Sequence, residues 1–147
     1  MQHFEPDAMA TVLYAVIEPG LDRMHIRLAG HFPPVIAYPG QPAELASVVT
    51  GAIFGITDQV RRPVTTVQIP PGALLCFYTD GLIERPGELI DDGLARLCQA
   101  VTAQSPEAAC AAVMHALVGS GPARDDIALL MVRRQPDHAG VEVDAGA

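Results

Sequence analysis

Tryptophan is absent from this sequence, and aromatic residues make up only 5% of its 147 residues. Basic residues are scarce as well, because nine arginines and no lysines face seventeen aspartates and glutamates, which gives a formal net charge of −8. A surface this acidic repels nucleic acids and anionic membranes. We therefore expect neither a nucleic acid nor a membrane as a partner.

Long apolar runs are also missing, and none approaches the roughly 18–20 residues that cross a membrane. The N-terminal stretch MQHFEPDAMA has neither the basic region nor the apolar region of a signal peptide. The three cysteines, Cys76, Cys98 and Cys110, are unclustered and lie in apolar patterns, which predicts buried thiols in a reducing compartment. Together these features predict a cytoplasmic protein.

What is present indicates a single domain rich in strands and turns. Thirteen glycines and thirteen prolines supply the turns. Alternating or β-branched segments predict strands over Ala10–Glu18, Met24–Gly30, Val35–Tyr38, Val64–Ile69, Ala73–Thr79 and Ile127–Val132. Turn residues at Pro19–Asp22 predict a hairpin between the first two strands. Those at Pro70–Gly72 predict a second hairpin, between Val64–Ile69 and Ala73–Thr79.

Two helices are predicted before the last strand. Apolar residues at the i, i+3, i+4, i+7 spacing run from Leu94 to Val101 and from Cys110 to Leu117. The expected end signals are Asp91 or Asp92 as the cap of the first helix, Ser105 with Pro106 at the start of the second, and Gly119 at its end. Hairpin strands combined with helices indicate the α+β class.

Two acidic turns flank predicted strands. Asp80, with Gly81 after it, follows one strand, and Asp125 and Asp126 precede the last strand. If these strands are antiparallel neighbours, the carboxylates of Asp80 and Asp125 meet at one sheet edge, where their repulsion can recruit a cation. Hard oxygen ligands suit Mg²⁺ or Mn²⁺. Ordinary turn chemistry, or pairing of Asp125 with Arg124, explains the same residues without a metal.

Other candidate functional residues each have a structural explanation. His31 could contact phosphate or metal, although a histidine at the end of a half-buried strand is more often structural. His25 lies on the polar face of its strand and is expected to be solvated. Arg61 and Arg62 could bind a phosphorylated partner, or form a solvated loop. Cys76 has no base nearby in sequence, so a thiol nucleophile is not expected.

Four segments, LAGHFPPVI, IPPGALLCFYTDGLIE, DDGLARL and ARDDIALLMVRR, occur in this order. In order and spacing they resemble the SpoIIE-like bacterial branch of the metal-dependent (PPM-type) protein serine/threonine phosphatases, over about Ala10 to Arg134. On this basis we expect residues 1–134 to form a partial phosphatase domain, and residues 135–147 to form a polar tail that is disordered.

The resemblance implies an antiparallel β-sandwich with helices on both outer faces and a two-metal site at one edge. Asp80 matches the family's TDG metal ligand, Asp125 matches its late metal ligand, and Asp126 matches a neighbouring capping position. The implied reaction is direct hydrolysis of phosphoserine or phosphothreonine by a water that Mg²⁺ or Mn²⁺ activates. The implied substrate is a phosphorylated regulatory protein such as an anti-anti-sigma factor.

The sequence also departs from that family. Its opening GGD motif, which supplies a metal-bridging aspartate, has no counterpart, because Asp7 in EPDA lacks both glycines and a preceding strand. The glycine-rich PPLG loop appears only as TGAIFGI, at Thr50–Ile56. We therefore expect a domain truncated on its N-terminal side, with at most one weakly held ion and negligible hydrolysis by the isolated chain.

Three interpretations follow from this departure: an inactive remnant, a half-domain completed by association, and a non-catalytic interaction module in partner-switching regulation. Missing early strands would leave apolar surface of Val64–Thr79 and Ile127–Val132 uncovered. The sequence therefore predicts a homo-oligomer, or a second chain that covers the exposed sheet.

Overall fold

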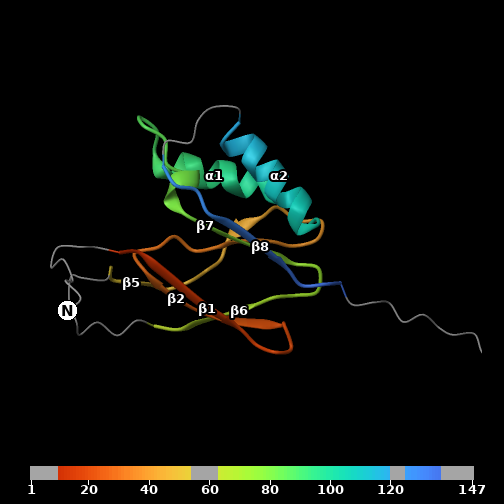
Figure 1. The fold of residues 1–147 in the computed structure, drawn as a ribbon. Helices are drawn as coiled ribbons and strands as arrows, with labels where there is room; N and C mark the ends of the chain where they lie inside the picture. The colour runs from red at the N-terminus through yellow and green to blue at the C-terminus, as the bar shows by residue number, and fades with distance from the viewer. Residues whose placement is uncertain (1–9, 54–62, 120–124, 137–147) are drawn as a thin grey trace, which may run out of the picture.

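The computed structural model describes residues 10–53, 63–119 and 125–136. They form three layers, two β-sheets packed face to face and a helical layer over one of them (Figure 1). The strands are β1 (Val12–Ile17), β2 (Arg23–Ala29), β3 (Val35–Ala37), β4 (Glu44–Leu45), β5 (Thr50–Gly51), β6 (Thr65–Gln68), β7 (Leu74–Tyr78) and β8 (Leu129–Arg133). The helices are a short 3₁₀ helix at Asp80–Leu82, α1 (Ile90–Ala100) and α2 (Pro106–Leu117). The predicted α+β class and β-sandwich are confirmed.

The first sheet is built around β2. It pairs antiparallel with β1 on one side, which confirms the predicted first hairpin, and with β6 and the short parallel β5 on the other. Alternation along β2 buries Met24, Ile26 and Leu28 completely, as its sequence predicts. These three side chains form the floor of the core between the two sheets.

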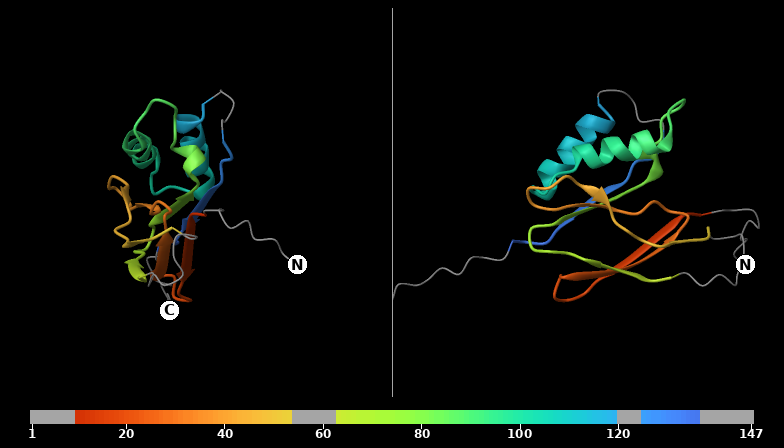
Figure 2. Two further views of the ribbon diagram at one scale, coloured as in Figure 1. Left: turned by 90° about the vertical axis from the view of Figure 1, so that its left-hand side faces the viewer. Right: turned by 180° about the vertical axis from the view of Figure 1, so that it is seen from behind.

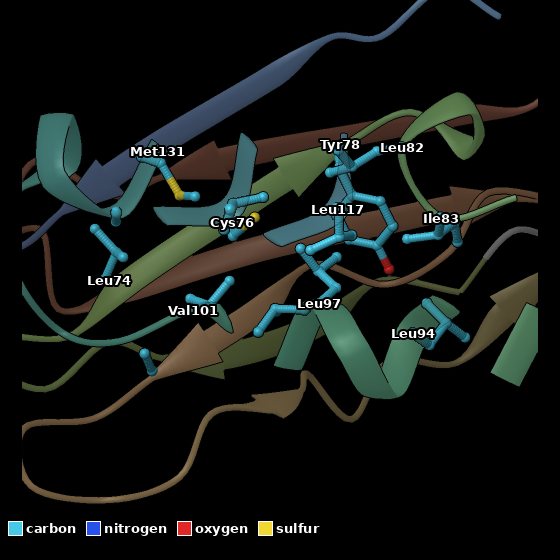
Figure 3. Close-up of a cluster of buried hydrophobic side chains, with 14 residues drawn as sticks. Leu74, Cys76, Tyr78, Leu82, Ile83, Leu94, Leu97, Val101, Leu117 and Met131 are labelled. Atoms are coloured by element: carbon cyan, nitrogen blue, oxygen red, sulfur yellow. The ribbon is translucent and has the colours of Figure 1, made fainter. Parts of the chain in front are cut away.

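The second sheet has the order β4-β3-β7-β8, and all its pairs are antiparallel. Its central strand β7 is covered on both faces. Leu75 faces the first sheet, whereas Leu74 and Cys76 pack beneath the helices with Leu97 and Met131 (Figure 3). Burial on both faces explains why this strand reads as a continuous apolar run.

The predicted second hairpin is wrong. β6 belongs to the first sheet and β7 to the second, so the chain crosses between sheets at Pro70–Gly72. The corner is bonded to other segments, because the Ile69 N–H donates to the Asp22 carbonyl (2.7 Å) and the Gly72 N–H to the Arg134 carbonyl (3.0 Å). Gly72 adopts a φ of 80°, which favours glycine.

The helix ends are partly as predicted. For α2, Ser105 accepts a hydrogen bond from the Ala108 N–H, and the Gly119 N–H donates back to the Met114 carbonyl at a φ of 64°, so both ends are confirmed. For α1 the predicted aspartate cap is wrong, because the N-cap is Leu89 and the two aspartates lie within the first turn. There they stabilise the helix through its dipole.

Both helices cover the same outer face, that of the second sheet (Figure 2). The outer face of the first sheet carries no helix in the described part of the chain, and Tyr14 there is 64% exposed. The second helical layer, which the resemblance implies for the whole family domain, is therefore not among the described residues. Asp7, Arg61, Arg62 and the tail beyond Pro136 lie outside them. Neither helix in the described segments has the length and apolarity to cross a membrane.

Candidate metal centre

The two acidic turns meet at one end of the second sheet. β7 and β8 are antiparallel neighbours, with Tyr78 opposite Leu129. Asp80 follows β7 and Asp125 precedes β8, and the ladder continues into the turns because the Thr79 N–H donates to the Ala128 carbonyl (3.1 Å). The expected arrangement of the two strands is confirmed.

Gly81 is the point where these two turns touch. A Cβ atom added at Gly81 would lie 2.5 Å from the carbonyl oxygen of Asp126 and 3.2 Å from the Cβ of Asp125. Any side chain at this position would push the turns apart. The glycine after Asp80 is therefore required by close backbone approach, and not by turn geometry alone.

The Thr79 side chain links the turns. Its hydroxyl donates to the carbonyl of Asp126 (3.2 Å) and accepts the N–H of Ala128 (2.9 Å). The sequence interpretation missed this residue. The available signal was a short hydroxyl side chain at the strand end immediately before Asp80.

Each aspartate also stabilises its own turn. The Oδ1 atom of Asp80 accepts the Gly81 N–H (3.0 Å), and Oδ1 of Asp125 accepts the Asp126 N–H (2.8 Å). The turn interpretation is thus correct locally. Both residues are exposed, and no ion pair engages either of them in the described segments. Their second carboxylate oxygens can therefore act as ligands.

The donor set fits a hard divalent cation that keeps part of its hydration shell. Exposed carboxylate oxygens are the ligands that Mg²⁺ and Mn²⁺ prefer. Across the described residues, however, no group of three or more His, Cys, Asp or Glu side chains is gathered. Asp80 and Asp125 therefore fit one loosely held ion, and their role as ligands stays a prediction.

A pocket of about 810 Å³ adjoins this corner. Its volume lies in the range of ligand pockets. Its lining combines apolar and charged residues, namely Gly81, Leu82, Glu84, Arg85, Pro86, Glu88, Ile90, Leu117, Val118, Asp125 and Ile127. Two of the charged side chains in the lining are held in place by hydrogen bonds. Arg85 donates to the Leu117 carbonyl (2.5 Å), and Glu88 accepts from Arg96 (2.5 Å). Neither contact has a recognisable sequence pattern.

The two candidate histidines, His25 and His31, contact residues outside the acidic corner. Nδ1 of His31 lies 2.7 Å from the carbonyl oxygen of Phe32, and no hydrogen bond connects it to the acidic corner. His25 is not simply solvated as expected, because its ring nitrogens lie 2.6 Å from Glu18 and 3.0 Å from Thr66. Both therefore have structural contacts.

The thiol of Cys76 and the phenol of Tyr78, both on β7 in the core, are protonated at neutral pH. Burial, with smaller effects of Cys110 and Cys98, raises the pKa of Cys76 to about 12. Burial also raises the pKa of Tyr78, whose hydroxyl donates to the Pro33 carbonyl (2.9 Å). Cys76 is fully buried, whereas Cys98 and Cys110 are only partly buried. A protonated, buried Cys76 is not a nucleophile.

Comparisons with known proteins agree with the overall fold. The family model of stage II sporulation protein E (SpoIIE) matches residues 1–135. The RsbU and RsbW domains of Rv1364c from Mycobacterium tuberculosis match at 28% identity and a TM-score of 0.72, over 86% of this chain and 37% of that one. The manganese-presoaked phosphatase domain of the cell fate determinant SpoIIE from Bacillus subtilis matches at 21% identity and a TM-score of 0.65.

That second match covers 86% of this chain and 57% of the Bacillus subtilis chain, and its low identity establishes the fold alone. No curated protein matches significantly. The family model, by contrast, covers most of the sequence, including the segments that carry Asp80 and Asp125. The chain therefore belongs to the SpoIIE family, within the PPM-type protein phosphatases.

Proposed function

We propose that this chain is a metal-dependent phosphatase domain that acts on phosphoserine or phosphothreonine of a regulatory protein. The observation that carries the proposal is the contact of Gly81 with the Asp126 backbone. It brings Asp80 and Asp125 to one exposed corner, beside a pocket large enough for a substrate segment.

In this proposal Asp80 and Asp125 hold Mg²⁺ or Mn²⁺ through their outer carboxylate oxygens. The manganese presoak of the related SpoIIE crystals supports the choice of ion. When bound, such an ion neutralises phosphoryl oxygens and activates water. Thr79 fixes the separation of the two turns, so that both carboxylates keep their positions.

The pocket receives the part of the substrate next to the phosphorylated residue. Leu82 and Leu117 are buried at its floor, whereas Glu84 and Glu88 are exposed at its rim. The Arg85 guanidinium is held at the C-terminal end of α2 by its bond to Leu117. This lining favours a substrate segment with an apolar side chain and a basic neighbour.

An anti-anti-sigma protein is the regulatory substrate that family membership favours. A matched chain carries an RsbU domain together with an RsbW domain. The resemblance of the four sequence segments also implies a role in bacterial partner switching, which supports this choice of substrate. A phosphorylated protein of this type would present its phosphoserine to the acidic corner.

The small number of metal-ligating carboxylates supports a second function. Two gathered carboxylates hold Mg²⁺ poorly, because the ion demands near-octahedral geometry and releases water reluctantly. The described part of the site therefore also suits an interaction module, which binds a phosphorylated regulatory protein without turning it over.

One experiment separates these functions. A serine-phosphorylated anti-anti-sigma protein is incubated with the chain and Mn²⁺, and both complex formation and released phosphate are measured for wild type, Asp80→Asn and the control Asp91→Asn. Phosphate release that Asp80→Asn abolishes and Asp91→Asn preserves supports the phosphatase. Complex formation without release supports the interaction module, and neither complex nor release contradicts both.

A further inference from the structure

The pocket beside the acidic corner has a single cation among the described residues that line it, Arg85. The same lining carries the carboxylates of Glu84, Glu88 and Asp125. In the described segments, however, Arg85 forms no ion pair, and Glu88 binds Arg96 instead. The positive charge of Arg85 is therefore not neutralised by a described neighbour.

The backbone of Arg85 is fixed by a tight turn with the sequence RPGE. The Glu88 N–H donates to the Arg85 carbonyl (3.1 Å) across Pro86 and Gly87. Proline presets the second position of such a turn, and Gly87 has the positive φ, 82°, that the third position of a type II turn requires. Arg85 thus begins its side chain from a rigid point of the chain.

The guanidinium of Arg85 is also oriented at its far end. Its Nη2 donates to the carbonyl of Leu117, at the C-terminal end of α2. Arginine has five N–H donors in a planar group, and phosphate oxygens match that geometry. No hydrogen bond to another described residue engages Nε or Nη1. The group can therefore keep its bond to Leu117 and still donate to an anion.

Arg85 lies close to the acidic corner along the chain. The N–H groups of Ile83 and Glu84 both donate to the Asp80 carbonyl (2.9 Å each), which closes one helical turn after Asp80. Such a turn rises ~1.5 Å per residue, so Glu84 lies about 6 Å along it from Asp80, and Arg85 is the next residue. Asp125 lines the same pocket. The guanidinium and the candidate metal ligands therefore border one volume.

The charges of this volume require a further cation when a phosphorylated residue enters. A phosphoserine carries nearly two negative charges at neutral pH. A divalent ion between Asp80 and Asp125 balances only these two carboxylates. Glu84 adds a negative charge to the same lining, and no ion pair in the described segments offsets it. Among the described lining residues, Arg85 alone can supply the positive charge.

We propose that Arg85 binds the phosphoryl group of the phosphoserine substrate while its Nη2 remains on the Leu117 carbonyl. The inference rests on the proposed function for the identity of the substrate, but binding does not require turnover. A purely structural arginine would only cap the C-terminal end of α2. Such a cap would not respond to a phosphate monoester, which makes the two roles separable.

Nuclear magnetic resonance of the Arg85 Nε–H group in the wild-type chain with Mg²⁺ tests the proposal directly. Arg85→Lys identifies the signal, because it removes that signal alone. Titration with O-phosphoserine to about 50 mM should shift the signal along a saturating curve, as expected for a millimolar contact. Serine at matched ionic strength should not shift it. The Nε–H signal of Arg27, which is exposed on β2, is the internal control.

Three results of this titration would overturn the proposal. The first is no shift of the Arg85 signal over the whole range. The second is an equal shift of the Arg27 signal, which indicates a general salt effect. The third is a response to inorganic phosphate without one to O-phosphoserine, which indicates a site for the free anion and not for the substrate.

A binding experiment with the regulatory protein measures the contribution of Arg85 to recognition. Fluorescence anisotropy compares the serine-phosphorylated and unphosphorylated anti-anti-sigma protein. Arg85→Gln should reduce the preference for the phosphorylated form at least about tenfold, because it removes a charged hydrogen bond to the phosphoryl group. Arg27→Gln is the matched control and should preserve the preference.

The outcomes separate this inference from the proposed function. Phosphate release by wild type with an equal KM for Arg85→Gln, and no Nε–H shift, would keep the phosphatase and refute the role of Arg85. A saturating shift without any phosphate release would keep the role of Arg85 and refute the phosphatase. Urea titration shows whether each variant is folded, and Arg85→Lys replaces Arg85→Gln if the glutamine variant is not.

Discussion

The hydroxyl of Thr79 donates a hydrogen bond to the carbonyl of Asp126 at 3.2 Å, across 47 positions of sequence. The same oxygen accepts the Ala128 N–H, so one small side chain satisfies two backbone groups of the opposite turn. The two acidic turns are thus held together by a neutral residue. Their mutual repulsion does not have to be overcome by a salt bridge.

Thr79→Val keeps the shape of this side chain and removes both hydrogen bonds. We expect the free energy of unfolding to fall by about 1–2 kcal/mol, because the Asp126 carbonyl and the Ala128 N–H lose their partner. Urea titration measures the change. Thr79→Ser restores the hydroxyl and should recover most of the loss, and a valine variant as stable as wild type would show that water replaces both bonds.

Asp80→Asn and Asp125→Asn should each weaken Mn²⁺ binding about tenfold or more, because each removes a charged ligand of the same ion. Isothermal titration calorimetry on the apo chain checks this. Asp91→Asn alters an exposed carboxylate in the first turn of α1 and should leave the affinity unchanged. Equal affinity in all four proteins would refute a shared site.

Gly93→Ala should destabilise the protein even though alanine is the better helix former by about 1 kcal/mol. A Cβ at position 93 would lie 2.0 Å from the carbonyl oxygen of Ile83, so α1 would have to move away from the segment beneath it. We expect a net loss of about 1–3 kcal/mol. Thermal unfolding followed by circular dichroism gives the sign, and a higher melting temperature than wild type would disprove the close contact.

Stability should fall with rising pH above about pH 9, because of Cys76. Its pKa is raised from an ordinary 9.0 to about 12 by burial, so its thiol ionises more readily in the unfolded chain. The stabilisation is complete below pH 9 and is lost as pH rises towards 12, by about 1.4 kcal/mol per pH unit.

Denaturant titrations from about pH 8 to pH 11 measure this slope. Cys76→Ala should reduce it, while Tyr78, whose pKa burial also raises, contributes in the same direction to both proteins. Identical slopes for wild type and Cys76→Ala would show that the thiol does not control alkaline stability.

Local patterns were enough to predict most elements of this fold. The alternation of Met24, Ile26 and Leu28 predicted a half-buried strand, and Ser105 with Pro106 predicted the start of α2. The crossing at Pro70–Gly72 was mistaken for a hairpin because prolines and a glycine mark a reversal and a change of sheet equally well. Only pairing with distant segments, such as Asp22 and Arg134, distinguishes the two.

The candidate site, like the fold, could be predicted only in part from the sequence. Asp80 and Asp125 could be selected from the sequence, since each is a carboxylate at the end of an apolar strand. The roles of Thr79 and Arg85 could not, because each depends on a backbone carbonyl supplied by another part of the chain. A residue that binds main-chain atoms leaves no complementary side chain for sequence reasoning to find.

The pairing of β7 with β8 has a kinetic consequence. The bond between Ala128 and Thr79 spans 49 positions, whereas the contacts within α1 and α2 are local. Closing so long a loop costs conformational entropy, so β8 should join the sheet after the helices have formed. The acidic corner is therefore one of the last features to appear during folding. An ion held there binds the completed sheet and no earlier state, so its binding stabilises the fully folded chain over every partly folded one.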